Sequence, residues 1–432
     1  MSRSTAGATL RSQFEIEPRA LAAGLHPPTP TASVSRVTQS VTIVRQAPRY
    51  EPALVRESLA KLGIDWRKLI QPGDRVLLKP NFIRESHSNR PDEWEQIITH
   101  GTVIAAVAEQ VTAAGGKIII ADAPQTDSDF EEICERTGIR QLDAEILDLR
   151  RESWRTENGV IVERRKLPED PRGYTLVNLA GKSCFAGKSG NFYGADYDTT
   201  FTAKHHSDGR HEYLLSRSAM DADVFINLPK MKTHKKVGVT LSLKNLVGIN
   251  GDKNFLPHFC LGTPDEGGDE FPDSSVRNKV QSKLVKALKG GPWWTPTVKK
   301  VGSKIFGDTG KVVRSGNWHG NDTTWRMVLD LNLALFQKPR RYLSIVDGIV
   351  AGEGNGPMEA DAKPCGVLVA GTHPVAVDFV CTELMGFDWR KLPTIREGLR
   401  VFGLQPEDIV AEIGETFRFR PHFGWAGHIE KD

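Results

Sequence analysis

The stretch that decides the fold is Ala222-Asp-Val-Phe-Ile-Asn-Leu-Pro-Lys-Met-Lys-Thr-His234, in which a short apolar run leads directly into lysines and a histidine. The run 222–228 is typical of a buried strand. Further short runs rich in Val, Ile and Leu predict strands at 41–45, 75–80, 117–122, 342–347 and 366–370. Apolar residues at helical spacing predict helices at 53–70, 102–114, 374–385 and 394–402. This alternation predicts an α/β fold with a mostly parallel, doubly wound sheet.

The alternation is interrupted twice along the 432 residues, a length that suits about two domains. We expect a discontinuous main domain, with α/β parts at 41–150, 217–260 and 321–432. Insertions are expected at 151–216, with a strand near 174–179, and at 261–320. Residues 1–40 are rich in Ser, Thr, Arg and Pro and are predicted to be a disordered tail, with an organelle targeting segment as the alternative.

Cysteine spacing and hydropathy exclude several classes of protein. The five cysteines contain no CxxC pair, which excludes a local zinc ribbon and a local iron–sulfur cluster motif. Their odd number fits reduced thiols. No apolar run reaches the ~20 residues that a membrane-spanning helix needs. We therefore expect a cytoplasmic protein, peripheral to a membrane at most.

Polar residues follow the predicted strands at their carboxyl ends, where parallel α/β sheets bind ligands. We expect these ends to share one cavity. Four residues are predicted to bind an anionic substrate: Lys79, Asn81, Lys230 and Lys232. Asp122 and Asp347 are predicted catalytic residues that orient the proton-transferring groups or bind a metal.

The segment 230–253 is the densest in lysine. If its apolar part, 237–247, is a helix, Lys244 lies on a buried face, where desolvation lowers its pKa and suits it to acid–base or covalent chemistry. His234 is the predicted partner in catalysis, and Asn245 is predicted to contact the substrate. His258 and His100 are candidate ligands of a divalent metal, or proton carriers.

Two further segments are candidates for the site. Asn321 and Arg326 are predicted to bind substrate, since Arg suits a carboxylate or phosphate, although Asp322 beside them could simply cap a helix. The glycine-rich run 348–357 is predicted to be a flexible functional loop whose N–H groups could cradle an anion.

Residues 277–314 form a strongly basic segment. They hold ten Lys or Arg and one acid, a net charge of +9, against +3 for the whole chain and therefore −6 for the remainder. Within it and at its edge, apolar residues recur at helical spacing: Val276, Val280, Leu284 and Leu288. Three interpretations stay open: a helix that packs its apolar side on the body, a contact with an anionic membrane or lipid-linked substrate, and, least favoured, nucleic acid.

Several motifs together resemble one bacterial and archaeal family, catalogued as domain of unknown function 362. They are Lys79-Pro-Asn81, the strand end at Asp122, the stretch Asp223–His234, Thr240–Gly248, Val346-Asp-Gly348 and His373–Asp378. Some members of that family carry iron–sulfur ferredoxin modules, which the cysteines here do not reproduce. A more distant likeness is to the nickel-pincer lactate racemases, in which a Lys holds the cofactor. Here His100, His234, Lys244 and His258 follow in the same order, but Ser242-Leu243 replaces the Gly-Gly before that Lys.

These observations predict an enzyme that acts on a small anionic metabolite, or its lipid- or sugar-linked form, by Lys/His acid–base chemistry. A divalent metal could assist, and no cofactor is identified by spacing. The alternatives are a non-catalytic cofactor-binding or assembly protein, a nickel-pincer-type racemase or epimerase, and an iron–sulfur-associated redox protein.

Overall fold

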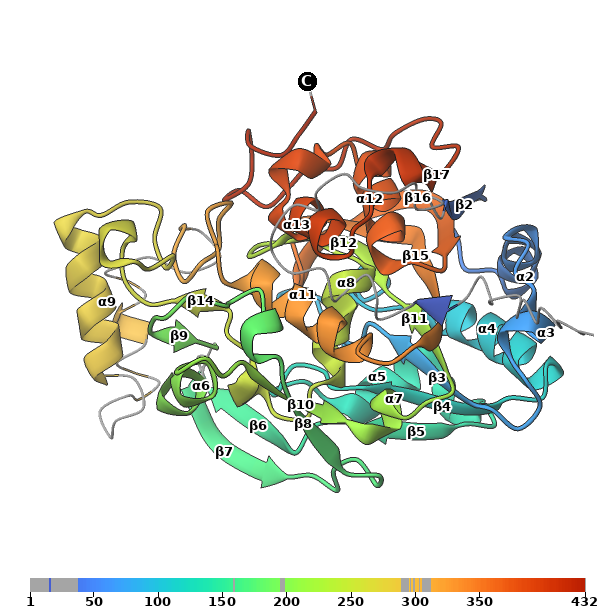
Figure 1. The fold of residues 1–432 in the computed structure, drawn as a ribbon, viewed down its shortest axis with the longest axis horizontal. Coiled ribbons are helices and arrows are strands. Elements are labelled where there is room, and N and C mark those ends of the chain that lie inside the picture. The colour runs from blue at the N-terminus through green and yellow to red at the C-terminus, as the bar shows by residue number, and fades with distance from the viewer. Residues whose placement is uncertain are drawn as a thin grey trace, which may run out of the picture.

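The computed structural model describes residues 15–16, 38–157, 160–194, 199–288, 295, 297, 300–302, 304 and 312–431. Its centre is one large sheet (Figure 1). The strands of this sheet, in spatial order, are β17 (Ile409–Val410), β2 (Gln39–Arg45), β16 (Glu359–Gly371), β15 (Arg340–Asn355), β11 (Val224–Leu228), β3 (Arg75–Pro80), β4 (Lys117–Asp122) and β5 (Glu145–Asp148). Most of the predicted tail 1–40 lies outside the described residues. The short β1 (Glu15–Ile16) pairs with β15.

The sheet is mostly parallel, as predicted. β15, β11, β3, β4 and β5 pair in parallel, as do β17 and β2. In this row of eight strands, β16 is antiparallel to both of its neighbours, β15 and β2. The predicted strands 342–347 and 366–370 are therefore parts of one long hairpin.

The glycine-rich run after Asp347 is not a loop, so that prediction was wrong. β15 continues to Asn355, and Gly352 pairs with Ala362 of β16. A Cβ on Gly352 would lie 2.9 Å from the Ala360 Cβ and 3.0 Å from the Lys232 Cβ. The glycine is therefore needed for close packing of neighbouring strands, which is one use of glycine inside a strand.

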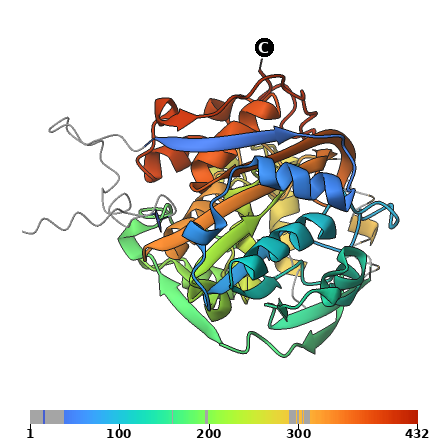
Figure 2. The ribbon, with the colours of Figure 1, turned by 90° about the vertical axis from the view of Figure 1, so that its right-hand side faces the viewer.

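Side chains alternate along each strand and supply two cores, one on each face of the sheet. Val76 and Leu78 of β3 face one core, and Leu77 faces the other. Helices α2 (Pro52–Lys61), α4 (Gly101–Ala113) and α5 (Phe130–Thr137), with the short α3 (Trp66–Leu69), belong to the first core. Figure 2 shows α2 and α4, in blue and cyan, across that face. The second core holds α11 (Thr324–Leu335), α12 (Pro374–Leu384) and α13 (Pro393–Val401).

The two interrupted stretches form small elements beside the main sheet. The first contains the hairpin of β6 (Glu152–Glu157) and β7 (Val160–Lys166), the pair β8 (Tyr174–Asn178) and β10 (Glu212–Ser216), and helices α6 (Thr199–His205) and α7 (Arg217–Met220). β9 (Phe192–Tyr193) pairs with β14 (Phe259–Cys260). In the second stretch, α9 (Val276–Leu288) lies at the periphery (Figure 1). No helix in the described ranges is long and apolar enough to cross a bilayer.

The segment 237–247 is not one continuous helix, which was the condition for the predicted buried face of Lys244. After β12 (Lys230–His234) the chain turns into the antiparallel β13 (Gly238–Thr240). A short helix, α8 (Ser242–Asn245), follows and continues into a 3-10 turn at Leu246–Ile249. Gly238 has φ +80°, and a Cβ there would lie 2.2 Å from Leu392 Cδ2. Because only glycine tolerates both constraints, this position directs the chain into the turn.

Candidate functional site

A cavity of about 200 Å³ lies beyond the carboxyl ends of β3, β4 and β12, and we call it the inner cavity. Its position is the one where parallel α/β sheets bind ligands. It brings together polar side chains from distant parts of the sequence: Asn81, Asp122, Lys232, His234, Lys235, Lys236, Lys244, Asn245, Lys253 and His258. Seven of these are predicted site residues. The structure therefore brings Lys244, His234 and His258 together around one cavity, as the sequence predicts.

Lys244, on α8, is the most unusual side chain in this cavity. The residue is only 8% exposed. Its ammonium makes no hydrogen bond or ion pair with any residue that the structure describes. Burial, with a smaller contribution from the positive charge of Lys79, lowers the pKa of Lys244 to about 8. A lysine in this state exchanges protons near neutral pH and attracts an anion when charged.

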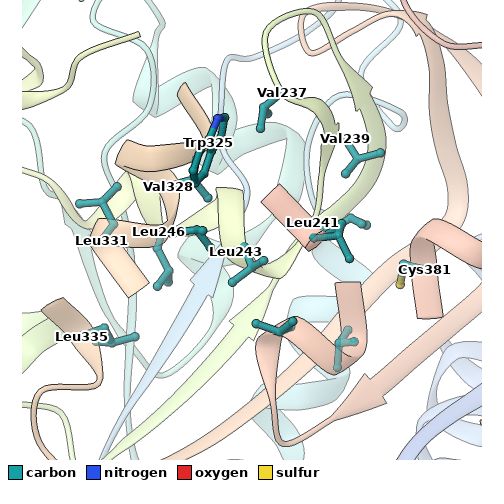
Figure 3. Packing of buried hydrophobic residues seen from close by; sticks show 14 of the residues in the cluster. Val237, Val239, Leu241, Leu243, Leu246, Trp325, Val328, Leu331, Leu335 and Cys381 are labelled. Atoms are coloured by element: carbon teal, nitrogen blue, oxygen red, sulfur yellow. The ribbon is translucent and has the colours of Figure 1, made fainter. Parts of the chain in front are cut away.

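Apolar packing holds the segment that carries Lys244. Leu243 and Leu246 pack against Val328 and Leu331 of α11 (Figure 3). At the start of α8, the carboxylate of Asp378 accepts hydrogen bonds from Ser242 N (2.7 Å) and Leu243 N (2.8 Å). The lysine therefore enters the cavity from a short, firmly anchored turn.

The two imidazoles beside Lys244 have different proton arrangements. His234 Nδ1 accepts a hydrogen bond from Lys236 N (3.0 Å), which puts the proton of the neutral ring on Nε2. His258 Nδ1 lies 2.9 Å from the Leu256 carbonyl oxygen, which can only accept, so its lone pair is on Nε2. Burial first, then the charge of Lys244, lowers the pKa of both rings well below the usual value. One neutral ring is thus a donor at Nε2 and the other an acceptor.

A chain of buried amides forms the floor of the inner cavity. Lys232 Nζ donates to Asn81 Oδ1 (2.7 Å), and Asn81 Nδ2 donates to Asn245 Oδ1 (2.9 Å). Asn245 Nδ2 in turn donates to Asn227 Oδ1 (2.7 Å). Burial, reinforced by the charges of Lys230 and Lys244, lowers the pKa of Lys232 well below its usual range. These bonds fix the amide orientations at the cavity wall.

Asp122 is engaged in a buried ion pair beneath the cavity. Its Oδ1 lies 2.7 Å from Lys79 Nζ, and Oδ2 accepts from Phe82 N at 2.7 Å. Burial lowers the pKa of Lys79, although Asp122 opposes the shift. A Cβ on Gly248 would lie 1.7 Å from Asp122 Oδ1, so the chain after α8 rests directly on this pair. Lys79 therefore supports Asp122 and does not line the cavity.

Lys230 and Asp347 form a separate buried network. Lys230 Nζ lies 2.8 Å from Asp347 Oδ2 and 2.7 Å from the Tyr50 hydroxyl, which donates to Asp347 Oδ1. His100 N donates to Asp347 Oδ2 (3.0 Å), and the His100 ring stacks on Tyr50 and on Trp94. These predicted site residues do not line the inner cavity. They connect β12, β15 and the start of α4.

The last two predicted substrate-binding residues also lie outside the cavity. Asn321 Nδ2 donates to the His258 carbonyl oxygen (2.9 Å), and its Oδ1 accepts from Thr324 N (2.8 Å). Asn321 therefore positions His258 through its backbone. Arg326 pairs with Asp322 (2.9 Å) and donates to the Cys184 carbonyl oxygen (2.6 Å), beside a different cavity.

Three cavity lysines were not among the predicted catalytic or substrate-binding residues: Lys235, Lys236 and Lys253. Lys253 donates to the Ala123 carbonyl oxygen (2.7 Å), and burial lowers its pKa to about 7. Lys236 lies with its ammonium 4.6 Å from the centre of the Phe259 ring. These lysines belong to the lysine-dense segment 230–253, and that density was the only indication in the sequence that they lie at the site. No spacing rule separates lysines that line a cavity from solvated ones.

The residues do not fit the complete set implied by the nickel-pincer likeness. His234, Lys244 and His258 line one cavity, but His100 lies outside it, against Tyr50. Within the described ranges no three His, Cys, Asp or Glu side chains are grouped as a metal site would group them. The predicted pairing of His100 with His258 as metal ligands is therefore not assembled, and no chemical step is assigned to such a cofactor.

Comparison with known proteins gives a family and one clear relative. The thylakoid-associated protein sll1697 of Synechocystis sp. (strain ATCC 27184 / PCC 6803 / Kazusa) is 29% identical over 374 residues, which cover 86% of this chain and 81% of the relative. Among solved structures, the lactate racemase apoprotein from Thermoanaerobacterium thermosaccharolyticum is 11% identical with a TM-score of 0.34; the alignment covers 84% of this chain and spans 60% of that one. A family model described as a domain of unknown function matches residues 76–176 and 184–383. The chain belongs to this family, DUF362.

Proposed function

We propose that the protein is an enzyme that binds a small carboxylate or phosphate metabolite in the inner cavity and moves protons through its lysine and histidines. The proposal is carried by the buried ammonium of Lys244, which has no partner among the residues that the structure describes. Five lysines line the cavity with a single carboxylate, Asp122, which already pairs with Lys79. A buried charge without a partner is costly, so a bound anion would supply the missing counter-charge.

The imidazoles support proton transfer as the reaction type. Once Lys244 holds the anionic group, His258 Nε2 can accept a proton from the substrate and His234 Nε2 can donate one to a substrate oxygen. Both rings are neutral near pH 7 because their pKa values are lowered, so neither competes with Lys244 for the anion. Lipid- or sugar-linked forms of the same head group belong to the same substrate class.

Anion binding tests the first half of the proposal. Calorimetric titration with inorganic phosphate and with malonate should detect binding to the wild type. Lys244→Met, which keeps the apolar stem and removes the charge, should weaken that binding at least about tenfold, a change of ~1.4 kcal/mol. Lys117→Met is the matched control, because Lys117 is exposed at the opposite end of β4. Equal affinity in Lys244→Met and wild type would reject the proposal.

Catalysis is tested separately from binding. The protein is incubated with a cellular metabolite extract in D₂O, and mass spectrometry searches for anionic metabolites that gain deuterium. Wild type and Lys117→Met should label at least one metabolite, whereas His258→Gln and Lys244→Met should label none. Phosphate binding without any labelling would favour the alternative, a cofactor-binding or assembly protein.

We also propose that α9 contacts an anionic membrane surface. Val276, Val280 and Leu284 lie along one line of the helix and are 78%, 54% and 43% exposed. Gln281 and Ser282 are instead buried. A helix that turns its apolar line outward among lysines is suited to the interface of an anionic bilayer. The thylakoid association in the relative's name supports this proposal. The predicted continuation of the basic segment at 289–311 lies almost entirely outside the described residues.

Vesicle flotation tests the membrane contact. Wild type should float with vesicles that contain phosphatidylglycerol and not with pure phosphatidylcholine. Val280→Asp/Leu284→Asp should remain at the bottom of the gradient. Leu176→Asp, which changes an apolar side chain of 50% exposure elsewhere, serves as the control and should still float. Flotation of the α9 variant would reject this role.

A further inference from the structure

A second cavity of about 470 Å³, which we call the outer cavity, adjoins the inner one. It lies between the β6–β7 hairpin and residues 251–254. Lys253 lines both cavities. Its ammonium donates to Ala123 O, and Ala123 also lines the inner cavity. The two cavities therefore share one lining residue, Lys253.

The outer cavity carries more positive than negative charge. Its lining holds five cationic side chains, those of Arg150, Arg151, Arg164, Lys166 and Lys253, against three carboxylates. The carboxylates are those of Glu152, Glu169 and Asp252. This excess favours an anionic ligand.

The charged groups of two of these cations donate no hydrogen bond to a residue in the described ranges. The Arg151 guanidinium lies 3.5 Å from Glu169 and 3.6 Å from Asp252, and forms no side-chain hydrogen bond with a described residue. The Lys166 ammonium has neither a hydrogen bond nor an ion pair within the described part of the chain. Arg150, in contrast, is saturated by Asp148 and by backbone carbonyl oxygens. Guanidinium and ammonium donors of this kind suit a phosphate.

The volume of the inner cavity is small for a complete small-molecule site. Sites for small molecules usually measure roughly 300–1,000 Å³. The inner cavity, about 200 Å³, is below that range, whereas the outer cavity, about 470 Å³, is within it. A substrate that occupied only the inner cavity would have to be very small.

We propose that the outer cavity binds a phosphate-class group at the far end of the same substrate whose reacting end occupies the inner cavity. Arg151 and Lys166 would hold this second anionic group, and Lys253 would lie between the two ends. The proposal rests on the proposed function, because it assigns the inner cavity to the reacting end. It identifies the substrate class as an elongated molecule with an anionic group at each end.

Equilibrium dialysis with labelled inorganic phosphate counts the two sites. Wild type should bind two phosphates per chain. Lys244→Met should lose the inner one, and Arg151→Gln/Lys166→Gln the outer one. Arg155→Gln/Arg165→Gln is the matched control: it removes two exposed cations of the same hairpin that do not line the cavity, and should keep both sites.

The outcomes separate this inference from the proposed function. One phosphate that only Lys244→Met removes would overturn the outer site and leave the proposed function standing. One phosphate that only Arg151→Gln/Lys166→Gln removes would overturn the proposed function, and with it the two-ended substrate.

A series of linear alkane bisphosphonates tests whether one molecule spans both cavities. At one chain length the affinity should exceed that of phosphate by about 100-fold through effective concentration, and either variant should abolish the gain. If no chain length gains more than about threefold, the two-ended substrate is overturned even where both sites bind phosphate.

Discussion

Replacing Lys244 by methionine should stabilise the folded protein near neutral pH while it removes anion binding. Burial lowers the pKa of this lysine from 10.5 to about 8. The folded state therefore releases the proton at a lower pH than the unfolded chain, and stability rises with pH between the two values. Below the folded pKa, the wild type carries the full cost of the desolvated charge. At ~1.4 kcal/mol per pKa unit this cost is about 3 kcal/mol.

Urea unfolding at two pH values measures this effect. Near pH 7, Lys244→Met should be more stable than wild type by up to about 3 kcal/mol, and above about pH 10.5 the difference should vanish because the wild-type amine is then neutral in both states. Lys117→Met, which removes an exposed charge, should change stability by less than about 0.5 kcal/mol at either pH. A loss of stability in Lys244→Met near pH 7, or a gain of the same size at both pH values, would refute the reasoning.

Three further predictions concern the same region. Lys230→Met should destabilise the protein by about 3–5 kcal/mol in urea unfolding, since it leaves Asp347 charged and unpaired in the core; an unchanged unfolding midpoint would contradict this. Gly248→Ala should lower the thermal midpoint of unfolding and weaken phosphate binding, because the new Cβ would overlap Asp122, 1.7 Å from its Oδ1. Phosphate binding as tight as in wild type would show that the chain after α8 is not held against Asp122. Affinity for sulfate, whose charge is constant, should fall as pH rises from about 6 to 9, since Lys253 and Lys244, with pKa values of about 7 and about 8, lose their protons; a flat titration curve would count against both lysines.

Strand positions could be predicted because buried parallel strands are short, continuous runs rich in Val, Ile and Leu. The runs 75–80 and 117–122 became β3 and β4 with unchanged bounds. The glycine content of the run 348–357 led to the wrong prediction of a flexible loop, because Gly352 is required there for close packing and not for flexibility. Gly352 has to be small because Ala360 and Lys232 crowd it, and such crowding depends on partners distant in the sequence.

The candidate site could be predicted only in part for a similar reason. Strand ends located Asn81, Asp122 and His234 near one another, because topology alone brings such ends together. The sequence could not distinguish Lys244, which lacks a partner among the described residues, from Lys230, whose charge is matched by Asp347. That difference depends on which carboxylate lies within ion-pair distance, and this is a property of the tertiary structure.

The titration of the Lys244 side chain tests the central claim most directly. Lysine labelled with ¹³C beside its amine can be followed by NMR, and the signal is assigned by its absence from Lys244→Met. Without ligand, the amine should titrate near pH 8, and saturating phosphate should raise that value by at least about one pH unit because an anion favours the charged form. A lysine that titrates near its ordinary value of 10.5 and does not respond to phosphate would contradict the account.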